Sequence, residues 1–148
     1  MGMLPSYRDW HPVTQATFAF GYGLSASPLQ LARAYGVLAN NGLKKDIKLL
    51  LDEEETNVSR VFSSDLSKTV NNMLESVVSE SGTGKNAMIP HYRVAGKTAT
   101  LHKVKAGGGY DENKYVSAFA GFSPASNPRV VTVVIIDDFT ERVLDVGD

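Results

Sequence analysis

A short run of side chains between residues 97 and 100 combines one ammonium group with two hydroxyls. In a strand, Thr98 and Thr100 would share one face and Lys97 and Ala99 the other, because successive side chains alternate. Two hydroxyls and a nearby ammonium can bind a carboxylate through charge-assisted hydrogen bonds. At a sheet edge, the strand's N–H groups would also be available to stabilise an oxyanion. The same residues also fit a polar edge strand that binds nothing.

The Gly96-Lys97-Thr98 triplet also invites comparison with a phosphate-binding loop. A Walker A loop needs Gly-x-x-x-x-Gly-Lys-Ser/Thr between a strand and a helix. Its first glycine would fall at position 91, which is His91, and the residues after Thr98 continue a strand-like pattern. The other Gly-Lys pair, Gly84-Lys85, fails as well, because Asn86 follows it in place of Ser or Thr. A nucleotide-binding protein is therefore the weakest hypothesis for this sequence.

The sequence offers little for metal or cofactor chemistry. No two of His11, His91 and His102 have a spacing typical of metal ligands, and the chain has no cysteine. We interpret all three histidines as surface or loop residues. The acidic run 52–55 reads as a solvated loop or hairpin tip, because fixed ligand spacing is missing. We expect no metal and no cofactor.

The composition fits one globular domain and gives no electrostatic reason to expect nucleic acid. The chain has 148 residues, of which 43% are hydrophobic and 21% charged, with a net charge of -1. Its longest apolar run, Val130–Ile136, is far shorter than the roughly 18 residues that span a bilayer. The first residues also lack the basic-then-apolar order of a signal peptide.

Two helices are predicted upstream of the Lys-Thr-x-Thr run. Ser27 and Gln30 form a capping-box pattern that starts a helix over residues 28–40, and Asn-Asn-Gly at 40–42 ends it. A second helix begins at Ser63 or Ser64 and ends near residues 79–81, before a Gly-Thr-Gly turn at 82–84. We interpret residues 1–20 as irregular or extended, with a flexible corner at residues 21–23.

Three strands follow the helices, and their short connections favour antiparallel neighbours. We predict them at Tyr92–Lys103, Tyr115–Phe122 and Arg129–Asp137, with a loop from Ala106 to about Asn113. The third strand is almost wholly apolar, which indicates burial on both faces in the middle of the sheet. The fold class is therefore α+β, a three-stranded antiparallel sheet with two main helices packed against it. Residues 139–148 read as a loose tail.

Three separate motifs, in order, resemble the class B, division-type penicillin-binding proteins. The resemblance covers roughly residues 15–138. It rests on the segments 21–35 and 38–42, on Ser-Gly-Thr-Gly at 81–84 with Val-Ala-Gly-Lys-Thr-Ala-Thr at 94–100, and on 113–115, 119–125 and 128–129. It implies that the three strands are the C-terminal strands of a penicillin-binding-protein/β-lactamase-like sheet.

The resemblance also implies an activity and roles for residues. The family transfers acyl groups through a serine nucleophile, cross-linking D-Ala–D-Ala stem peptides of peptidoglycan, and β-lactams mimic that substrate. By resemblance, Lys97 supplies positive charge, Thr98 and Thr100 hold the substrate carboxylate, and the Thr100 N–H is one oxyanion donor. It further implies a membrane-anchored parent at the periplasmic or extracytoplasmic face of the bacterial inner membrane, with cell-division membrane proteins as partners.

The sequence departs from the family at two points. It contains neither Ser-x-x-Lys nor Ser-x-Asn, so we interpret residues 1–148 as the C-terminal lobe of the domain, a single incomplete domain that is inactive alone. A non-catalytic binding module derived from that lobe is the alternative. Ala99 stands where the family has glycine, and its methyl could cost about 1–3 kcal/mol in a tightly packed site. As part of the first departure, we also expect the family's last helix to be missing, which would expose sheet surface and favour self-association.

Overall fold

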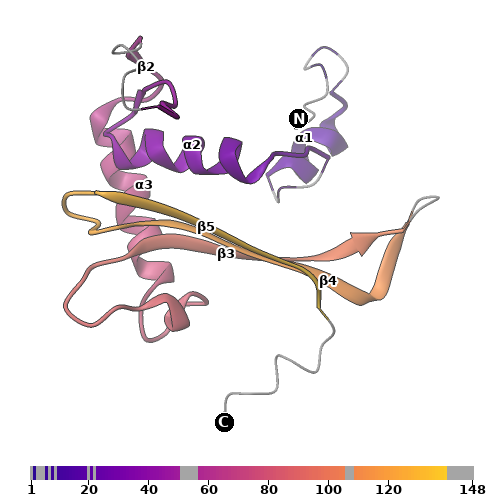
Figure 1. The fold of residues 1–148 in the computed structure, drawn as a ribbon. Helices are drawn as coiled ribbons and strands as arrows, with labels where there is room; N and C mark the ends of the chain where they lie inside the picture. The colour runs from indigo at the N-terminus through magenta and orange to yellow at the C-terminus, as the bar shows by residue number, and fades with distance from the viewer. Residues whose placement is uncertain are drawn as a thin grey trace.

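A computed structural model shows the architecture of the chain (Figure 1). It describes residues 2, 6, 8, 10–19, 21, 23–50, 57–105 and 109–139. The predicted acidic run 52–55, part of the loop predicted after residue 105 and the tail beyond residue 139 lie outside these residues. The fold is α+β, with helices packed against a three-stranded antiparallel sheet, as predicted.

The first main helix, α2 (Pro28–Ala39), has the ends that its sequence predicts. The Ser27 hydroxyl accepts a hydrogen bond from the Gln30 backbone N–H, and the Gln30 side chain accepts one from the Ser27 N–H. At the other end Gly42 takes a φ of 83°, and its N–H bonds the Val37 carbonyl at 2.8 Å. Glycine adopts this left-handed conformation without steric cost, so the helix ends here.

The second main helix, α3 (Ser64–Val77), starts as predicted but ends earlier. Ser63 caps it by accepting a hydrogen bond from the Leu66 N–H at 3.1 Å. The predicted end at residues 79–81 is wrong, because the Val78 N–H already bonds the Glu75 carbonyl and Gly84 caps the Val77 carbonyl. A short 3-10 helix, η2 (Lys85–Ala87), follows the turn.

The prediction that residues 1–20 are irregular or extended is wrong, because α1 (Pro12–Phe18) lies within them. Proline at the first helical position is already fixed in a helical φ. The Gln15 N–H bonds the His11 carbonyl, and the rings of Trp10 and Phe18 meet edge to face at 4.5 Å. The two rings lie at opposite ends of this helix, which is too short to show an apolar period in the sequence.

The sheet consists of β3 (Ala95–Val104), β4 (Tyr110–Ser123) and β5 (Val130–Phe139), in that order. Both pairs are antiparallel. The α3 helix crosses the strands steeply, whereas α2 runs roughly along them (Figure 1). A separate small pair, β1 (Leu43–Lys44) with β2 (Ser59–Arg60), lies between the two main helices in the chain.

The loop predicted up to Asn113 is shorter than expected, because β4 already begins at Tyr110. After an irregularity beyond His102, the ladder resumes with Val104 opposite Tyr110. Gly109 has a φ of 79°, and its carbonyl accepts from the Lys105 N–H at 3.0 Å. The far ends of β3 and β4 therefore form an arm that projects beyond the helices (Figure 1).

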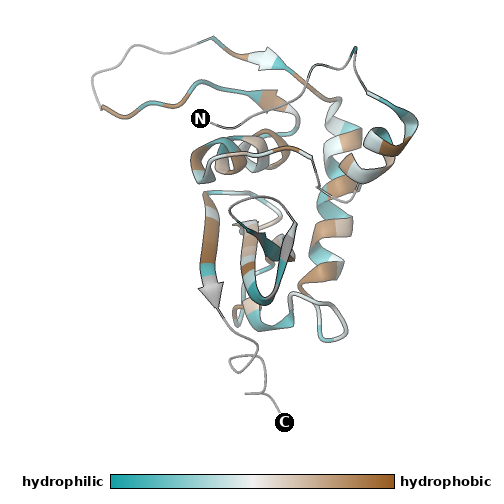
Figure 2. Ribbon diagram, turned by 90° about the vertical axis from the view of Figure 1, so that its right-hand side faces the viewer, coloured by the Kyte–Doolittle hydropathy of each residue, from teal (hydrophilic) through white to brown (hydrophobic). Residues whose placement is uncertain are grey.

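The expectation that the third strand is central and buried on both faces is wrong. Within the described sheet the middle strand is β4, and β5 is an edge strand. Val134 is 48% exposed and Ile135, on the opposite face, is 42% exposed. Figure 2 shows β5 hydrophobic along much of its length, on the side of the sheet away from α3. In a meander of three strands the last one lies at an edge, whatever its composition.

The core lies between the helices and the end of the sheet where β3 begins and β4 ends. Phe122 is 2% exposed and Ala95, directly opposite it on β3, is fully buried. Val37 of α2 and Val78 just after α3 are also buried, at 6% and 8% exposure. This core fixes the first residues of β3 and thus the start of the Lys-Thr-x-Thr run.

Candidate functional site

The Lys-Thr-x-Thr run lies on β3, and the register confirms the predicted division of its side chains. Thr98 pairs with Phe119 and Lys97 with Ala120. Residues opposite each other in an antiparallel pair share a face, so Lys97 is on the face of buried Ala120 and Thr98 on the other. Thr100 is exposed and Thr98 is half-buried.

The backbone polar groups of Thr98 and Thr100 point to the open side of β3. The Ala99 carbonyl faces β4, because the Ser117 hydroxyl donates to it at 3.4 Å. Successive carbonyls along a strand point to opposite sides, and each N–H lies on the side of its own residue's carbonyl. The Lys97 ammonium group donates to the Thr98 carbonyl at 2.7 Å. A cation and N–H groups that no other strand of the described sheet pairs with therefore meet at one edge.

The Gly-Thr-Gly turn after α3 reaches the same strand. Thr83 Oγ1 lies 3.1 Å from Thr98 Oγ1, a hydrogen bond between two hydroxyls. The turn needs glycine at position 82, where a Cβ atom would sit only 2.1 Å from the Val77 carbonyl oxygen. Gly84 is buried and donates to that same carbonyl at 2.8 Å. The end of α3 thus fixes the place of Thr83.

Two facing glycines allow β3 and β4 to lie beneath an aromatic ring. Gly96 pairs with Gly121, and the Phe119 ring covers both. A Cβ atom at Gly96 would meet Phe119 Cζ at 2.4 Å, and one at Gly121 would meet the Ala95 carbonyl oxygen at 2.6 Å. Phe119 also pairs with Thr98, so its ring lies on the face of the sheet that carries the Thr98 hydroxyl.

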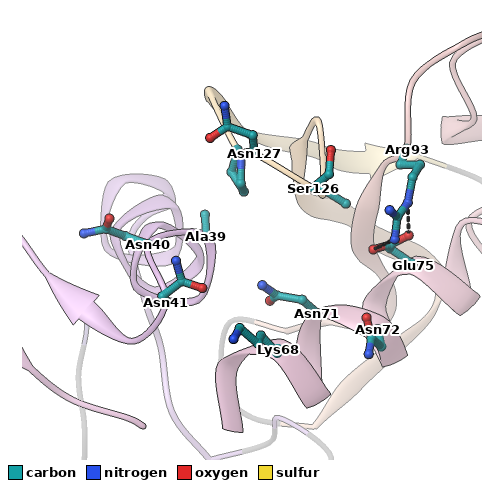
Figure 3. A pocket seen from close by; sticks show the side chains of 12 residues that line it. Ala39, Asn40, Asn41, Lys68, Asn71, Asn72, Glu75, Arg93, Ser126 and Asn127 are labelled. Atoms are coloured by element: carbon teal, nitrogen blue, oxygen red, sulfur yellow. Dashed lines mark hydrogen bonds and ion pairs between the residues drawn. The ribbon is translucent and has the colours of Figure 1, made fainter. Parts of the chain in front are cut away.

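An ion pair joins α3 to the residue that leads into β3. Arg93 donates through Nε and a terminal nitrogen to the two carboxylate oxygens of Glu75, at 2.8 and 2.9 Å (Figure 3). The Arg93 carbonyl in turn accepts from the Ala125 N–H at 2.8 Å. Bidentate pairing restricts the geometry more than a single contact does. It therefore ties the helix that carries the Gly-Thr-Gly turn to the strand that the turn contacts.

A polar hollow of about 340 Å³ lies beside this ion pair (Figure 3). Side-chain amides of Asn71, Asn72 and Asn127 line it, with Lys68 on α3. The Asn71 amide donates to the Leu38 carbonyl at 3.3 Å, which joins α3 to the end of α2. Asn71 and the Glu75–Arg93 ion pair bond neighbouring elements to each other, so we assign this hollow a structural role.

The methyl group of Ala99 is accommodated in the strand. Ala99 is exposed and lies opposite Ala118, another small residue. Both side chains are on the face that carries Lys97. The strand therefore forms with alanine here, and the effect of the methyl on ligands stays a prediction.

The three histidines lie on the surface, as predicted. His11 precedes α1, His91 lies in the loop before β3, and His102 is on β3, and all three side chains are exposed. Among the residues that the structure describes, no group of His, Asp and Glu side chains is placed to hold a metal ion. No helix in this part of the chain is long and apolar enough to cross a bilayer.

The comparisons with known proteins agree on one family. The family described as penicillin binding protein transpeptidase domain matches residues 1–143. The chain belongs to this family. The Lys-Thr-x-Thr strand and the Gly-Thr-Gly turn therefore lie in a penicillin-binding transpeptidase fold, as their resemblance implied.

Individual relatives cover nearly all of the chain but only part of their own length. The probable peptidoglycan D,D-transpeptidase PenA of Neisseria gonorrhoeae is 40% identical over 139 residues, which are 94% of this chain and 24% of that protein. The chain therefore spans about a quarter of the length of the curated relatives it matches.

Solved structures of the family have the same fold. The transpeptidase domain of Burkholderia pseudomallei penicillin-binding protein 3 is 43% identical, with a TM-score of 0.85 over 94% of this chain and 42% of that one. Penicillin-binding protein 3 of Mycobacterium tuberculosis, solved in complex with aztreonam, is 34% identical, with a TM-score of 0.85 over 93% of this chain and 34% of that one.

Sequence reasoning found the strand but not all of its neighbours. Lys97, Thr98 and Thr100 lie together on β3 as predicted. The contact of Thr83 with Thr98 was missed, because the alternation of side chains along a strand does not show which distant turn lies beside the strand. The role of Phe119 was also missed, and glycines paired across two strands are the signal that could have revealed it.

Proposed function

We propose that residues 1–148 form the C-terminal lobe of a peptidoglycan D,D-transpeptidase, a single incomplete domain that supplies one wall of the substrate cleft. The observation that carries this proposal is the meeting of Lys97, Thr98 and Thr100 at the open side of β3. Membership of the transpeptidase family and the similarity to solved transpeptidase domains, of which the chain covers only part, support it.

In this proposal the side chains of β3 recognise the anionic end of the substrate. The hydroxyls of Thr98 and Thr100 donate to the terminal carboxylate of a D-Ala–D-Ala stem peptide or of a β-lactam. Lys97 adds positive charge to the same region. The Thr100 N–H lies on the open side of the strand, where it would serve as one donor to the oxyanion of the acyl-transfer intermediate.

The chemical step itself needs groups that this sequence lacks. Attack on the D-Ala–D-Ala peptide bond requires the family's Ser-x-x-Lys and Ser-x-Asn motifs, and neither occurs in the 148 residues. The nucleophile in this proposal belongs to polypeptide outside this sequence, so the chain alone is inactive. A non-catalytic binding module derived from that lobe is the second candidate.

The place of action and the protein partners belong to the proposal as well. Peptidoglycan cross-linking takes place on the outer side of the bacterial inner membrane, so we place a membrane-anchored parent in the periplasm or at that face. The division-type resemblance favours cell-division membrane proteins as partners. The exposed apolar side chains of β5 favour contact with further protein, including a second copy of this chain.

A chimera tests whether this lobe can complete a transpeptidase cleft. In it, the chain replaces the matching part of the Burkholderia pseudomallei transpeptidase domain, of which it covers 42%. We expect intact-mass analysis to show a stoichiometric penicillin adduct on the chimera and none on this chain alone. Thr98→Val should slow acylation roughly tenfold or more, because a hydrogen bond to a charged group is lost, whereas Thr98→Ser should acylate nearly as fast as the chimera.

Two results would contradict the proposal. A chimera that folds cooperatively but acquires no adduct would show that this lobe cannot supply the cleft wall, and would favour the non-catalytic module. An adduct on the 148-residue chain alone would show that the nucleophile had been misplaced.

A further inference from the structure

We infer that Thr83 is a positioning residue, whose hydroxyl orients the Thr98 hydroxyl for a ligand carboxylate. The inference rests on the proposed function of Thr98. Its basis is the 3.1 Å contact between the two Oγ1 atoms, which joins the Gly-Thr-Gly turn to β3.

The number of hydroxyl protons decides which threonine can donate to a ligand. A threonine hydroxyl has one proton to donate and two lone pairs that accept. If Thr98 donates to Thr83, no proton of Thr98 remains for a ligand. If Thr83 donates to Thr98, the Thr98 proton is free to point at a carboxylate, which only accepts. A bound carboxylate therefore selects the arrangement in which Thr83 donates.

The same arrangement strengthens the ligand's hydrogen bond. A hydroxyl that accepts one hydrogen bond becomes a better donor in the next, because bonds in a chain polarise one another. Lys97 Nζ, held 2.7 Å from the Thr98 carbonyl oxygen, adds positive charge beside the same residue. Thr83 thus acts through Thr98 on the ligand.

The turn is built to hold Thr83 in place without using its side chain for packing. Gly82 closely approaches the Val77 carbonyl oxygen, and the Gly84 N–H is bonded to it. An ion pair of 3.1 Å between Lys85 and Glu80 closes the turn from outside. The Thr83 side chain is exposed. Replacing its hydroxyl by a methyl group should therefore leave the fold intact.

The test is a titration of this chain, with threonine methyl groups labelled for NMR. The probes are N-acetyl-D-alanyl-D-alanine and its methyl ester, which differ in the carboxylate charge. Thr83→Val is expected to weaken binding of the acid by about twofold to tenfold, the effect of one neutral hydrogen bond, and to leave ester binding unchanged. Thr83→Ser, which keeps the hydroxyl, should bind the acid like the wild type.

Each outcome separates the inference from the proposed function. A merely structural role for Thr83 would change acid and ester binding alike, and would overturn the inference. The inference would also be overturned if Thr83→Val bound the acid as tightly as the wild type while Thr98→Val lost the preference for acid over ester. A wild-type chain without that preference, or a Thr98→Val variant that keeps it, would refute the proposed function first and the inference with it.

Discussion

Ala99 and Tyr35 show how the surroundings act on a single side chain. Ala99 adds a methyl on the Lys97 face, and the strand accepts it because Ala118 opposite is small. Tyr35, on α2, packs toward the protein, and this burial raises the pKa of its phenol above the ordinary value of 10.0. Burial disfavours the charged phenolate.

The raised pKa of Tyr35 predicts a loss of stability at alkaline pH. The unfolded chain releases the phenol proton near pH 10.0, whereas the folded chain still holds it. The folded state then binds more protons, so the free energy of unfolding falls as pH rises above 10.0 through the folded pKa. Urea unfolding of Tyr35→Phe should show a shallower fall than the wild type. Tyr92→Phe, at an exposed tyrosine, is the control, and an equally steep fall in Tyr35→Phe would contradict this account.

At the scale of elements, the pairing of β3 with β4 depends on glycine at positions 96 and 121, where a side chain would not fit. Gly121→Ala would place a methyl 2.6 Å from the Ala95 carbonyl oxygen, so the ladder must shift. We expect the free energy of unfolding to fall by about 1–3 kcal/mol in urea unfolding.

Gly36→Ala is the matched control for Gly121→Ala. Gly36 lies inside α2, and its added methyl would meet no atom within 4 Å. Alanine is the better helix former, so this variant should gain about 0.5–1 kcal/mol. If Gly121→Ala were as stable as Gly36→Ala, the close approach of the two strands would not limit the sheet.

The elements that the sequence predicts well are those with local signals. The cap of α2 depends on Ser27 and Gln30, three positions apart, and is present as expected. The position of β5 depends on which strand pairs with which, and its apolar composition misled the prediction. The helix α1 was missed because it has no periodic apolar face. Its packing contact is instead one pair of rings, Trp10 and Phe18.

At the scale of the whole molecule, the proposed function makes the described chain one wall of a cleft rather than a closed active site. The proposed site occupies the open side of β3, whereas exposed apolar residues occupy β5 at the other edge. The chain spans 24% of its Neisseria gonorrhoeae relative. The motifs of the site could be recognised from sequence, because their order along the chain is specific. The contact of Thr83 with Thr98, which brings two of these motifs together, could be found only from the folded structure.

The most direct test of the account is the location of ligand binding on the chain. Titration with N-acetyl-D-alanyl-D-alanine should produce saturable NMR shifts centred on Thr83, Thr98 and Thr100, and the methyl ester should produce much smaller ones. Shifts centred instead on the polar hollow beside Asn71 and Lys68, or equal shifts with acid and ester, would contradict a carboxylate-binding wall on β3.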